Sequence, residues 1–338
     1  MAPPRTLVQA GTRRNLLMGG AAMLLGHGSV PAASTARVAA GATSSPESAS
    51  LLLRPQARFS LPFHLVNGYI LIDARIGAQA GRLMFDTGTP FPFLFNRHVL
   101  ALAKDQYLAQ GQAASGQKLV LYRQKAAVRG LVLSGGLAFK PLQGQPHADF
   151  GFLERAISRQ FLGMLGHGFS RDYEFAIDYQ QQRLDFHALP PASEGSDPAD
   201  LLYQADPGAR QLLALDFQPT GSGGKMPEFE LQLGEQVLQG FADTGNPGSL
   251  ELRPEMRQRL EDRGVLRVQP GIFLNGEAQS YLRASVRGLR LQGVELAPMH
   301  NLVLRMGASN RMGLGYHFFK NYVSVWNYRR QQIRIYEP

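Results

Sequence analysis

The sequence predicts an all-β protein with two similar halves and a few short helices. The first observation is a repeated motif, because Asp86-Thr87-Gly88 recurs 157 residues later as Asp243-Thr244-Gly245. The second is that other landmarks repeat in the same order and at similar separations. They are Val128-Arg129-Gly130-Leu131 with Val286-Arg287-Gly288-Leu289, and Gly163-Met164-Leu165-Gly166 with Met312-Gly313-Leu314-Gly315. The third is a series of runs in which apolar and polar residues alternate, as they do in half-buried strands.

Length and composition agree with a globular protein of two domains. The chain has 338 residues, of which 44% are hydrophobic and 18% charged. No apolar run approaches the ~18–20 residues that a membrane-spanning helix needs. The absence of cysteine excludes disulfides, thiol catalysis and cysteine-based zinc sites. The sequence thus predicts no stable membrane insertion, apart from any N-terminal signal.

The formal charge of +9 overstates the basicity of the folded part. Four arginines lie in the first forty residues, which contain no acid, so removal of that segment leaves +5. The remaining arginines are scattered among acidic residues and form no basic run. We therefore expect no nucleic-acid partner.

The N-terminus has the features of an export signal over residues 1–40. Arg13 and Arg14 directly precede a short apolar stretch from Leu16 to Leu25, and small residues follow. Thr-Arg-Arg-Asn-Leu-Leu resembles a twin-arginine signal, and an ordinary secretory signal is the alternative. Both predict a periplasmic or secreted protein. Residues 41–58, rich in Ala and Ser, are expected to form a loosely ordered leader.

Strand signals precede both motifs. The run from Tyr69 to Gly77 ends at a glycine, and the run from Glu228 to Gly234 alternates at period two. Each half also ends in two alternating runs that predict a hairpin. These are Tyr173 to Tyr179 with Leu184 to Phe186, and Val323 to Trp326 with Ile333 to Tyr336. The sequence therefore predicts equivalent strands at equivalent places in the two halves.

A short helix is expected after each motif. The first is predicted from near Arg97 to Leu108, and the second from Pro254 to just before Gly264, with proline at its start and glycine at its end. Residues 191–210 are rich in Pro, Ala, Ser, Asp and Gly and predict a linker. The two domains are then residues 59–190 and 211–338, each of ordinary domain size.

Two aspartates at equivalent positions suit a reaction that needs two facing carboxyl groups. Such groups cannot both ionise cheaply when they are close, so the pair shares a proton. The ionised member can take a proton from water, and the protonated member can hydrogen-bond a carbonyl oxygen. Asp86 and Asp243 are therefore the candidate catalytic residues. Gly88 and Gly245 would let backbone amides approach them, and the hydroxyls of Thr87 and Thr244 would hold the two loops rigid.

At these motifs the chain resembles the aspartic peptidase clan, whose members include the pepsin and retropepsin types. The resemblance covers residues 59–190 and 211–338, and the stretch from Leu165 to Tyr173 is especially similar to bacterial retropepsin-like proteins. It implies two β-barrel lobes with an interlobe cleft. It also implies hydrolysis of a peptide or protein substrate by an activated water, without metal or organic cofactor. We expect a monomer.

Two further features of the family pattern concern the residues after each motif and the flap over the cleft. Many relatives place a small hydroxyl residue two positions after the motif glycine, where it supports a carboxylate. Here those positions are Pro90 and Pro247, so we expect different surroundings for the two carboxylates. The family also covers its cleft with a hairpin flap. The candidate flap residues are Gly116 with Tyr122 and Gly276 with Tyr281.

Alternatives stay open beside this interpretation. A pair of lobes that kept both motifs without turnover would be a peptide-binding or envelope-interaction protein. A β-sandwich binding module unrelated to peptidases would place Asp86 and Asp243 far apart. His167 and His317 are expected to be structural, since no cluster has metal-ligand spacing. Phe91, Phe93 and Phe95 are expected in the core.

Overall fold

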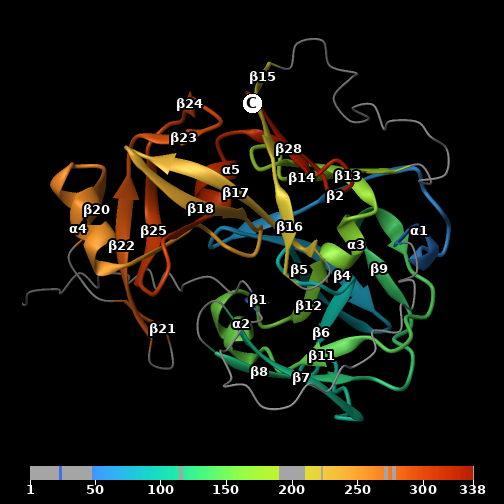
Figure 1. Ribbon diagram of the computed structural model, residues 1–338. Coiled ribbons are helices and arrows are strands. Elements are labelled where there is room, and N and C mark those ends of the chain that lie inside the picture. Colours follow the sequence, from blue (N-terminus) through green and yellow to red (C-terminus); the bar gives the residue numbers. More distant parts are fainter. Residues whose placement is uncertain are drawn as a thin grey trace, which may run out of the picture.

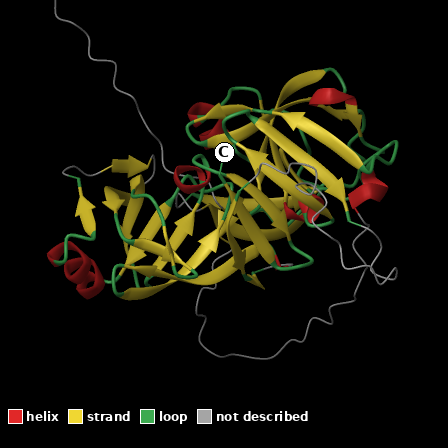
Figure 2. Cartoon of the chain, turned by 90° about the horizontal axis from the view of Figure 1, so that it is seen from above, coloured by secondary structure: helices red, strands yellow, loops and turns green. Residues whose placement is uncertain are grey.

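The protein is described by a computed structural model in which residues 23–24, 48–113, 117–189, 210–221, 224–269, 273–275 and 279–337 are placed. These residues form a mostly β structure with three sheets and a few short helices (Figure 1). Figure 2 shows the chain from above, with strands in most of the described part and short helices between them. The all-β prediction is confirmed at this level.

The first large sheet has eleven strands from the first half of the chain. Its order is β1-β7-β8-β11-β6-β12-β5-β4-β9-β10, with β3 paired to β4. The strands are β1 (Met23–Leu24), β3 (His64–Val66), β4 (Tyr69–Ile76), β5 (Gln79–Asp86), β6 (Phe93–Asn96), β7 (Gln106–Ala113), β8 (Lys118–Arg123), β9 (Leu131–Leu133), β10 (Leu137–Ala138), β11 (Pro146–Ala148) and β12 (Phe161–Gly166).

The second large sheet also has eleven strands, all from the second half. Its order is β20-β22-β25-β19-β26-β18-β17-β23-β24, with β16 paired to β17 and β21 to β22. The strands are β16 (Gln218–Thr220), β17 (Met226–Leu233), β18 (Gln236–Ala242), β19 (Ser249–Leu252), β20 (Leu266–Val268), β21 (Phe273–Asn275), β22 (Gln279–Val286), β23 (Leu289–Leu291), β24 (Val294–Glu295), β25 (Met299–Met306) and β26 (Arg311–Leu314).

A third sheet of six strands joins the two halves, in the order β15-β28-β27-β13-β14-β2. Its strands are β2 (Arg58–Pro62), β13 (Tyr173–Asp178), β14 (Arg183–Ala188), β15 (Gln211–Asp216), β27 (Val323–Asn327) and β28 (Gln332–Tyr336). Strand β13 pairs with β27, so Phe175 lies opposite Trp326 and their rings stack at 5.7 Å between centroids. The two predicted hairpins are confirmed, and each lies beside the other.

The helices are short and lie between strands. They are α1 (Ser48–Leu51), α2 (Gly151–Ala156), α3 (His167–Ser170), α4 (Pro254–Asp262), α5 (Tyr316–Phe319) and the 3-10 turn η1 (Ser134–Gly136). The helix predicted to open at Pro254 is confirmed as α4. The helix predicted from Arg97 to Leu108 is wrong, because Ala101 has a φ of +51° and strand β7 already begins at Gln106. A single turn, closed by Leu102 N–H on the Arg97 carbonyl, replaces it.

Both large sheets bring together the same two landmarks. In the first, β5 and β12 run parallel with Asp86 opposite Gly166. In the second, β18 and β26 run parallel with Ala242, the residue before Asp243, opposite Leu314. The sequence repeat is therefore a repeat of strand topology. It places each motif aspartate at the end of one strand, β5 or β18. The parallel neighbour of that strand, β12 or β26, leads into a glycine, Gly166 or Gly315.

Parts of the predicted N-terminal and linking segments lie outside the described residues. Of residues 1–40 only β1 is placed, against Gln112 and Ala113 of β7, and of residues 191–210 only Arg210. Where the leader is described, from residue 48, residues 48–51 form α1 and residues 53–58 are exposed. Leu52 is fully buried and bridges to Phe139. Among the described residues no helix combines the length and apolarity needed to cross a membrane.

Candidate active site

Asp86 and Asp243 lie together, although 157 residues separate them. Asp86 is the last residue of β5 and Asp243 directly follows β18. The amide nitrogen of Gly88 donates to Oδ1 of Asp86 at 2.8 Å and to Oδ1 of Asp243 at 3.1 Å. Both aspartates are fully buried. One backbone amide therefore serves two carboxyl groups, which requires them to face each other.

The motif glycines leave the space that this approach needs. A Cβ on Gly88 would lie 2.8 Å from both carboxyl oxygens of Asp243, and one on Gly245 would collide with Oδ1 of Asp86. The amide of Gly245 donates to Oδ1 of Asp243 at 2.9 Å. Any side chain at either glycine would thus push the opposite aspartate away.

The two motif threonines connect the two loops. The N–H of Thr87 donates to Oγ1 of Thr244 at 2.9 Å, and the N–H of Thr244 donates to Oγ1 of Thr87 at 3.0 Å. The hydroxyl of Thr244 also donates to the carbonyl oxygen of Phe85 at 3.0 Å. Both threonines are fully buried, so these bonds exclude water and fix the loops against each other.

Thr89 is a supporting residue that the sequence analysis missed. Its hydroxyl donates to Oδ2 of Asp86 at 2.8 Å. Pro90 therefore does not leave Asp86 without a hydroxyl partner, because the hydroxyl stands one position after the motif glycine, not two. The signal is the four-residue string Asp-Thr-Gly-Thr, of which only the first three residues recur in the second half.

The second half has no equivalent of this hydroxyl. Asn246 follows Gly245, and its side-chain amide donates to Oγ of Ser249 at 2.8 Å, while its Oδ1 accepts from the N–H of Gly248 at 2.9 Å. Oδ2 of Asp243 is buried and has no hydrogen-bond partner among the described residues. The two carboxyl groups therefore differ, since Asp86 has donors on both oxygens and Asp243 on one.

Gly166, which ends β12, and Gly315, which directly follows β26, lie behind the two loops. A Cβ on Gly166 would collide with the carbonyl oxygen of Phe91, and one on Gly315 with that of Asn246. The N–H groups that follow these glycines bind the same loops, as His167 N–H does at 2.8 Å to the Thr89 carbonyl. The backbone therefore packs closely behind both loops, at places where only glycine fits.

Lys225 is the second residue that the sequence analysis missed. It directly precedes β17, only 3% of it is exposed, and its ammonium donates to the carbonyl oxygen of Gly88. Its own carbonyl oxygen accepts from the hydroxyl of Tyr328 at 3.2 Å. The signal was positional, because Lys225 stands 157 residues after Gly68, at the offset that relates the two aspartates.

Burial governs the ionisation of the three charged groups. Burial raises the pKa of Asp243 to about 8, and the nearby charge of Asp86 adds to that rise, while the Gly245 amide and the charge of Lys225 act against it. Burial also raises the pKa of Asp86, while the Thr89 hydroxyl and the charge of Lys225 act in the opposite direction. Burial lowers the pKa of Lys225, and the negative charges of both aspartates act in the opposite direction. Near neutral pH the two carboxyl groups therefore keep one proton between them, and Asp243 carries it.

The candidate flap residues are only partly placed. Tyr122 lies on β8, opposite Tyr107 of β7, and stacks on His147 with 6.0 Å between ring centroids. Tyr281 lies near the start of β22, opposite Phe273, and is buried. Within the described ranges neither tyrosine has a hydrogen bond or ring contact with Asp86 or Asp243. Gly116 and Gly276, the two predicted turn glycines, lie outside the described residues.

The remaining sequence candidates lie in packed surroundings. The ring of His167 lies 4.3 Å from that of Tyr328, and burial lowers the pKa of His317 to about 4. Phe93 and Phe95 are fully buried and stacked, as expected of core residues. In the part of the chain that is described, no group of three or more His, Cys, Asp or Glu side chains could hold a metal ion.

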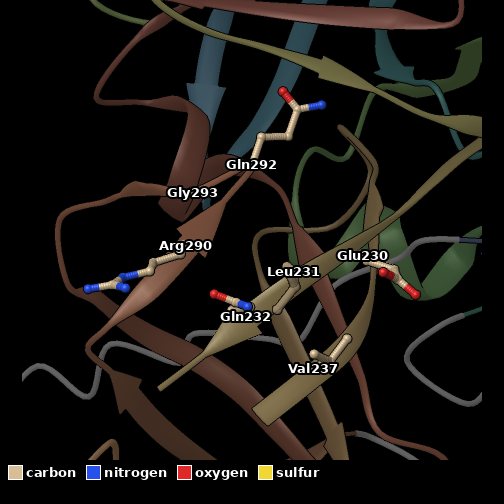
Figure 3. A pocket seen from close by; sticks show the side chains of 7 residues that line it. All are labelled: Glu230, Leu231, Gln232, Val237, Arg290, Gln292 and Gly293. Carbon is tan, nitrogen blue, oxygen red and sulfur yellow. The ribbon is translucent and has the colours of Figure 1, made fainter. Parts of the chain in front are cut away.

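A surface hollow on the second large sheet lies apart from this site (Figure 3). It is lined by residues of β17, β18 and β23 and the following turn, and includes neither aspartate. In Figure 3 the polar ends of Glu230, Arg290 and Gln292 point in different directions. The hollow therefore offers no convergent set of polar groups, and the paired carboxyls are the candidate site.

A comparison with protein-family models found no match. A search of the curated proteins found no relative either.

Proposed function

We propose that this protein is an exported aspartic endopeptidase in which Asp86 and Asp243 activate a water molecule. The fold in this proposal is that of pepsin-like proteins, with lobes at residues 59–190 and 211–338 and the aspartates where the lobes meet. The carrying observation is the pair of buried carboxyl groups that share the amide of Gly88. Two carboxyl groups held this closely, of which one is ionised and the other keeps its proton, are suited to combined base and acid catalysis.

The surroundings of the two acids support different roles. Asp86 accepts from an amide and a hydroxyl and has Lys225 nearby, all of which favour its ionised form. Asp243 has a pKa raised to about 8 and an Oδ2 without a partner among the described residues. We therefore assign Asp86 as the base and Asp243 as the acid at the start of the reaction.

The chemistry then follows in two steps. The Asp86 carboxylate removes a proton from water as the water oxygen bonds to the carbonyl carbon of the peptide. The Asp243 hydroxyl donates to the carbonyl oxygen, which gives a tetrahedral diol. As the carbon–nitrogen bond breaks, a proton passes from Asp86 to the leaving nitrogen. One hydroxyl of the diol returns its proton to the Asp243 carboxylate, which leaves a carboxylic acid and restores both aspartates to their starting states. Neither a metal ion nor an organic cofactor is needed in this sequence.

The test is cleavage of an unfolded protein by the purified mature chain between pH 3 and 8, with products identified by mass spectrometry. We expect Asp86→Asn and Asp243→Asn each to abolish cleavage and to keep the native circular dichroism spectrum. Asp262→Asn, at an exposed position on α4, is the matched control and should keep full activity. Normal turnover by either dyad variant would exclude the two-carboxylate mechanism. Peptide affinity without products would instead favour a peptide-binding protein.

Export is part of the proposal and has its own test. It is supported by Arg13 and Arg14 before the apolar stretch at residues 16–25. We expect the protein recovered outside the cytoplasm to begin after residue 30 when its N-terminus is sequenced. Arg13→Lys with Arg14→Lys should retain it in the cytoplasm if the signal is of the twin-arginine type.

A further inference from the structure

Lys225 breaks the symmetry of the two halves at the point where each contacts the other. In the first half, Gly68 directly precedes β4, and a Cβ there would lie 2.9 Å from the Tyr316 ring of the second half. In the second half the equivalent residue is Lys225, which reaches Gly88 of the first half. Both positions contact the opposite half, but only one brings a charge.

The ammonium of Lys225 is fixed to the loop that carries Asp86. It donates to the carbonyl oxygen of Gly88, which belongs to the same peptide unit as the N–H of Thr89. That N–H donates to the Asp86 carbonyl oxygen at 3.1 Å, and the Thr89 hydroxyl donates to Oδ2 of Asp86 at 2.8 Å. Lys225 thus holds the peptide unit that aims a donor at Asp86.

The lysine is itself held in place from a third direction. The hydroxyl of Tyr328, which follows β27, donates to the Lys225 carbonyl oxygen, and the same hydroxyl is hydrogen-bonded to Thr87. The ionisable groups that face Lys225 are Asp86 at the end of β5 and Asp243 directly after β18, and of these two the charge of Lys225 interacts more strongly with Asp86. Burial raises the pKa of Tyr328, so it stays neutral, and the ring of His167 of α3 lies 4.3 Å from the Tyr328 ring between centroids, in an edge-to-face arrangement.

We propose that Lys225 is a positioning residue of the Asp86/Asp243 pair, whose positive charge keeps Asp86 ionised and makes Asp243 the protonated partner. This rests on the proposed function. The charge balance of the site supports it, because one ionised aspartate, one neutral aspartate and one ammonium sum to zero in a buried space. Without the ammonium, a lone buried carboxylate would be left uncompensated.

The consequence is a defined direction of pH dependence. A nearby positive charge lowers the pKa of a carboxyl group, so its removal raises the pKa of Asp86. Cleavage needs one ionised aspartate, so activity at the acidic side would then begin at a higher pH.

The test compares the pH dependence of kcat/KM for the wild type, Lys225→Met and Lys225→Arg. We expect the acidic limb to move up by about one pH unit in Lys225→Met and to stay within a few tenths in Lys225→Arg. Lys140→Met, at an exposed position, is the matched control and should leave the profile unchanged. If Lys225→Met lowers kcat/KM equally at every pH, the lysine has only a structural role and the proposal is overturned.

A second measurement needs neither activity nor a lysine variant. In the wild type labelled with ¹⁵N-lysine, the Nζ resonance of Lys225 should shift as the aspartates titrate. The part of that shift that follows the ionisation of Asp86 should be lost in Asp86→Asn, and the whole shift should be retained in Asp262→Asn. An Nζ resonance that does not respond to Asp86 would contradict the proposal even if the enzyme cleaves peptides. A responsive resonance in a protein without cleavage would uphold the charge coupling and disprove the peptidase assignment alone.

Discussion

Thr87 and Thr244 hydrogen-bond each other reciprocally, with each N–H bound to the hydroxyl oxygen of the other at 2.9 and 3.0 Å. Each hydroxyl therefore satisfies a buried amide of the opposite loop. Thr87→Val keeps the shape and leaves the Thr244 N–H unpaired. We expect a loss of about 1–3 kcal/mol in the free energy of unfolding, measured by chemical denaturation.

Thr220→Val is the control for this prediction. Its hydroxyl makes one bond of 3.4 Å to the Met226 carbonyl in a half-buried place, so its loss should cost at most about 1 kcal/mol. Equal effects at the two positions would show that the reciprocal pair contributes nothing special. The double variant Thr87→Val with Thr244→Val should cost less than the sum of the singles, because both remove parts of one unit.

The Thr89 hydroxyl is predicted to set the acidic limit of activity. It donates to Oδ2 of Asp86 and so favours the carboxylate. Thr89→Val should raise the pKa of Asp86 and move the acidic limb of the kcat/KM profile up by about one pH unit. Ser249→Ala removes the acceptor of Asn246 on the other side and should cost stability without moving that limb. An unmoved limb in Thr89→Val would exclude Asp86 as the base.

The raised pKa of Asp243 predicts that stability depends on pH. Its folded-state pKa of about 8 lies above the usual 3.8, so the folded protein binds this proton more tightly than the unfolded chain. Stability from this group is therefore full below about pH 4 and falls as pH rises toward 8, by up to about 1.4 kcal/mol per pH unit. Asp243→Asn should flatten the slope. Denaturation at half-unit pH intervals measures it, and an identical slope in the variant would refute the shift.

A buried ion pair in the six-stranded sheet is predicted to be essential for stability. Glu174 of β13 and Arg334 of β28 lie 2.9 Å apart with side-chain exposures of 0% and 3%, and Asn327 donates to the same Glu174 oxygen at 2.9 Å. Glu174→Ala would leave a buried guanidinium without its carboxylate, at a cost of about 3–5 kcal/mol. Glu295→Ala breaks the exposed pair with Arg290 and should cost less than about 1 kcal/mol. Similar costs in thermal or chemical unfolding would contradict the assigned role of burial.

The repeat in the sequence predicted the strands that position the aspartates. Tyr69 to Gly77 and Glu228 to Gly234 form strands as expected, since period-two alternation is a local property that folding preserves. The segment after Arg97 failed because helical composition there is overruled by a left-handed Ala101 and by pairing of β7 with β8. Sheet pairing is set by distant partners, which local composition does not contain.

The site was predictable as a pair and not as a cluster. Asp86 and Asp243 can be recognised in the sequence because their motif is repeated, and their close approach follows from the equivalent topology of the two halves. Lys225 and Thr89 are the opposite case, because each lacks a matching residue in the other half. A search for what the halves share passes over residues that make them different. These unmatched residues, Thr89 and Lys225, give the Asp86 carboxyl group surroundings that the Asp243 carboxyl group does not have.

The six-stranded sheet shows that the repeated unit of the sequence is smaller than the unit that folds. The repeated unit is one half of the chain, yet the hairpin of each half pairs with that of the other through β13 and β27. Neither half alone can complete this sheet, and each would present an unpaired edge to solvent. A backbone cut between Leu189 and Arg210 would leave every one of these strand pairs intact. Two fragments made separately should therefore find each other and rebuild one protein, much as a dimer assembles from two copies.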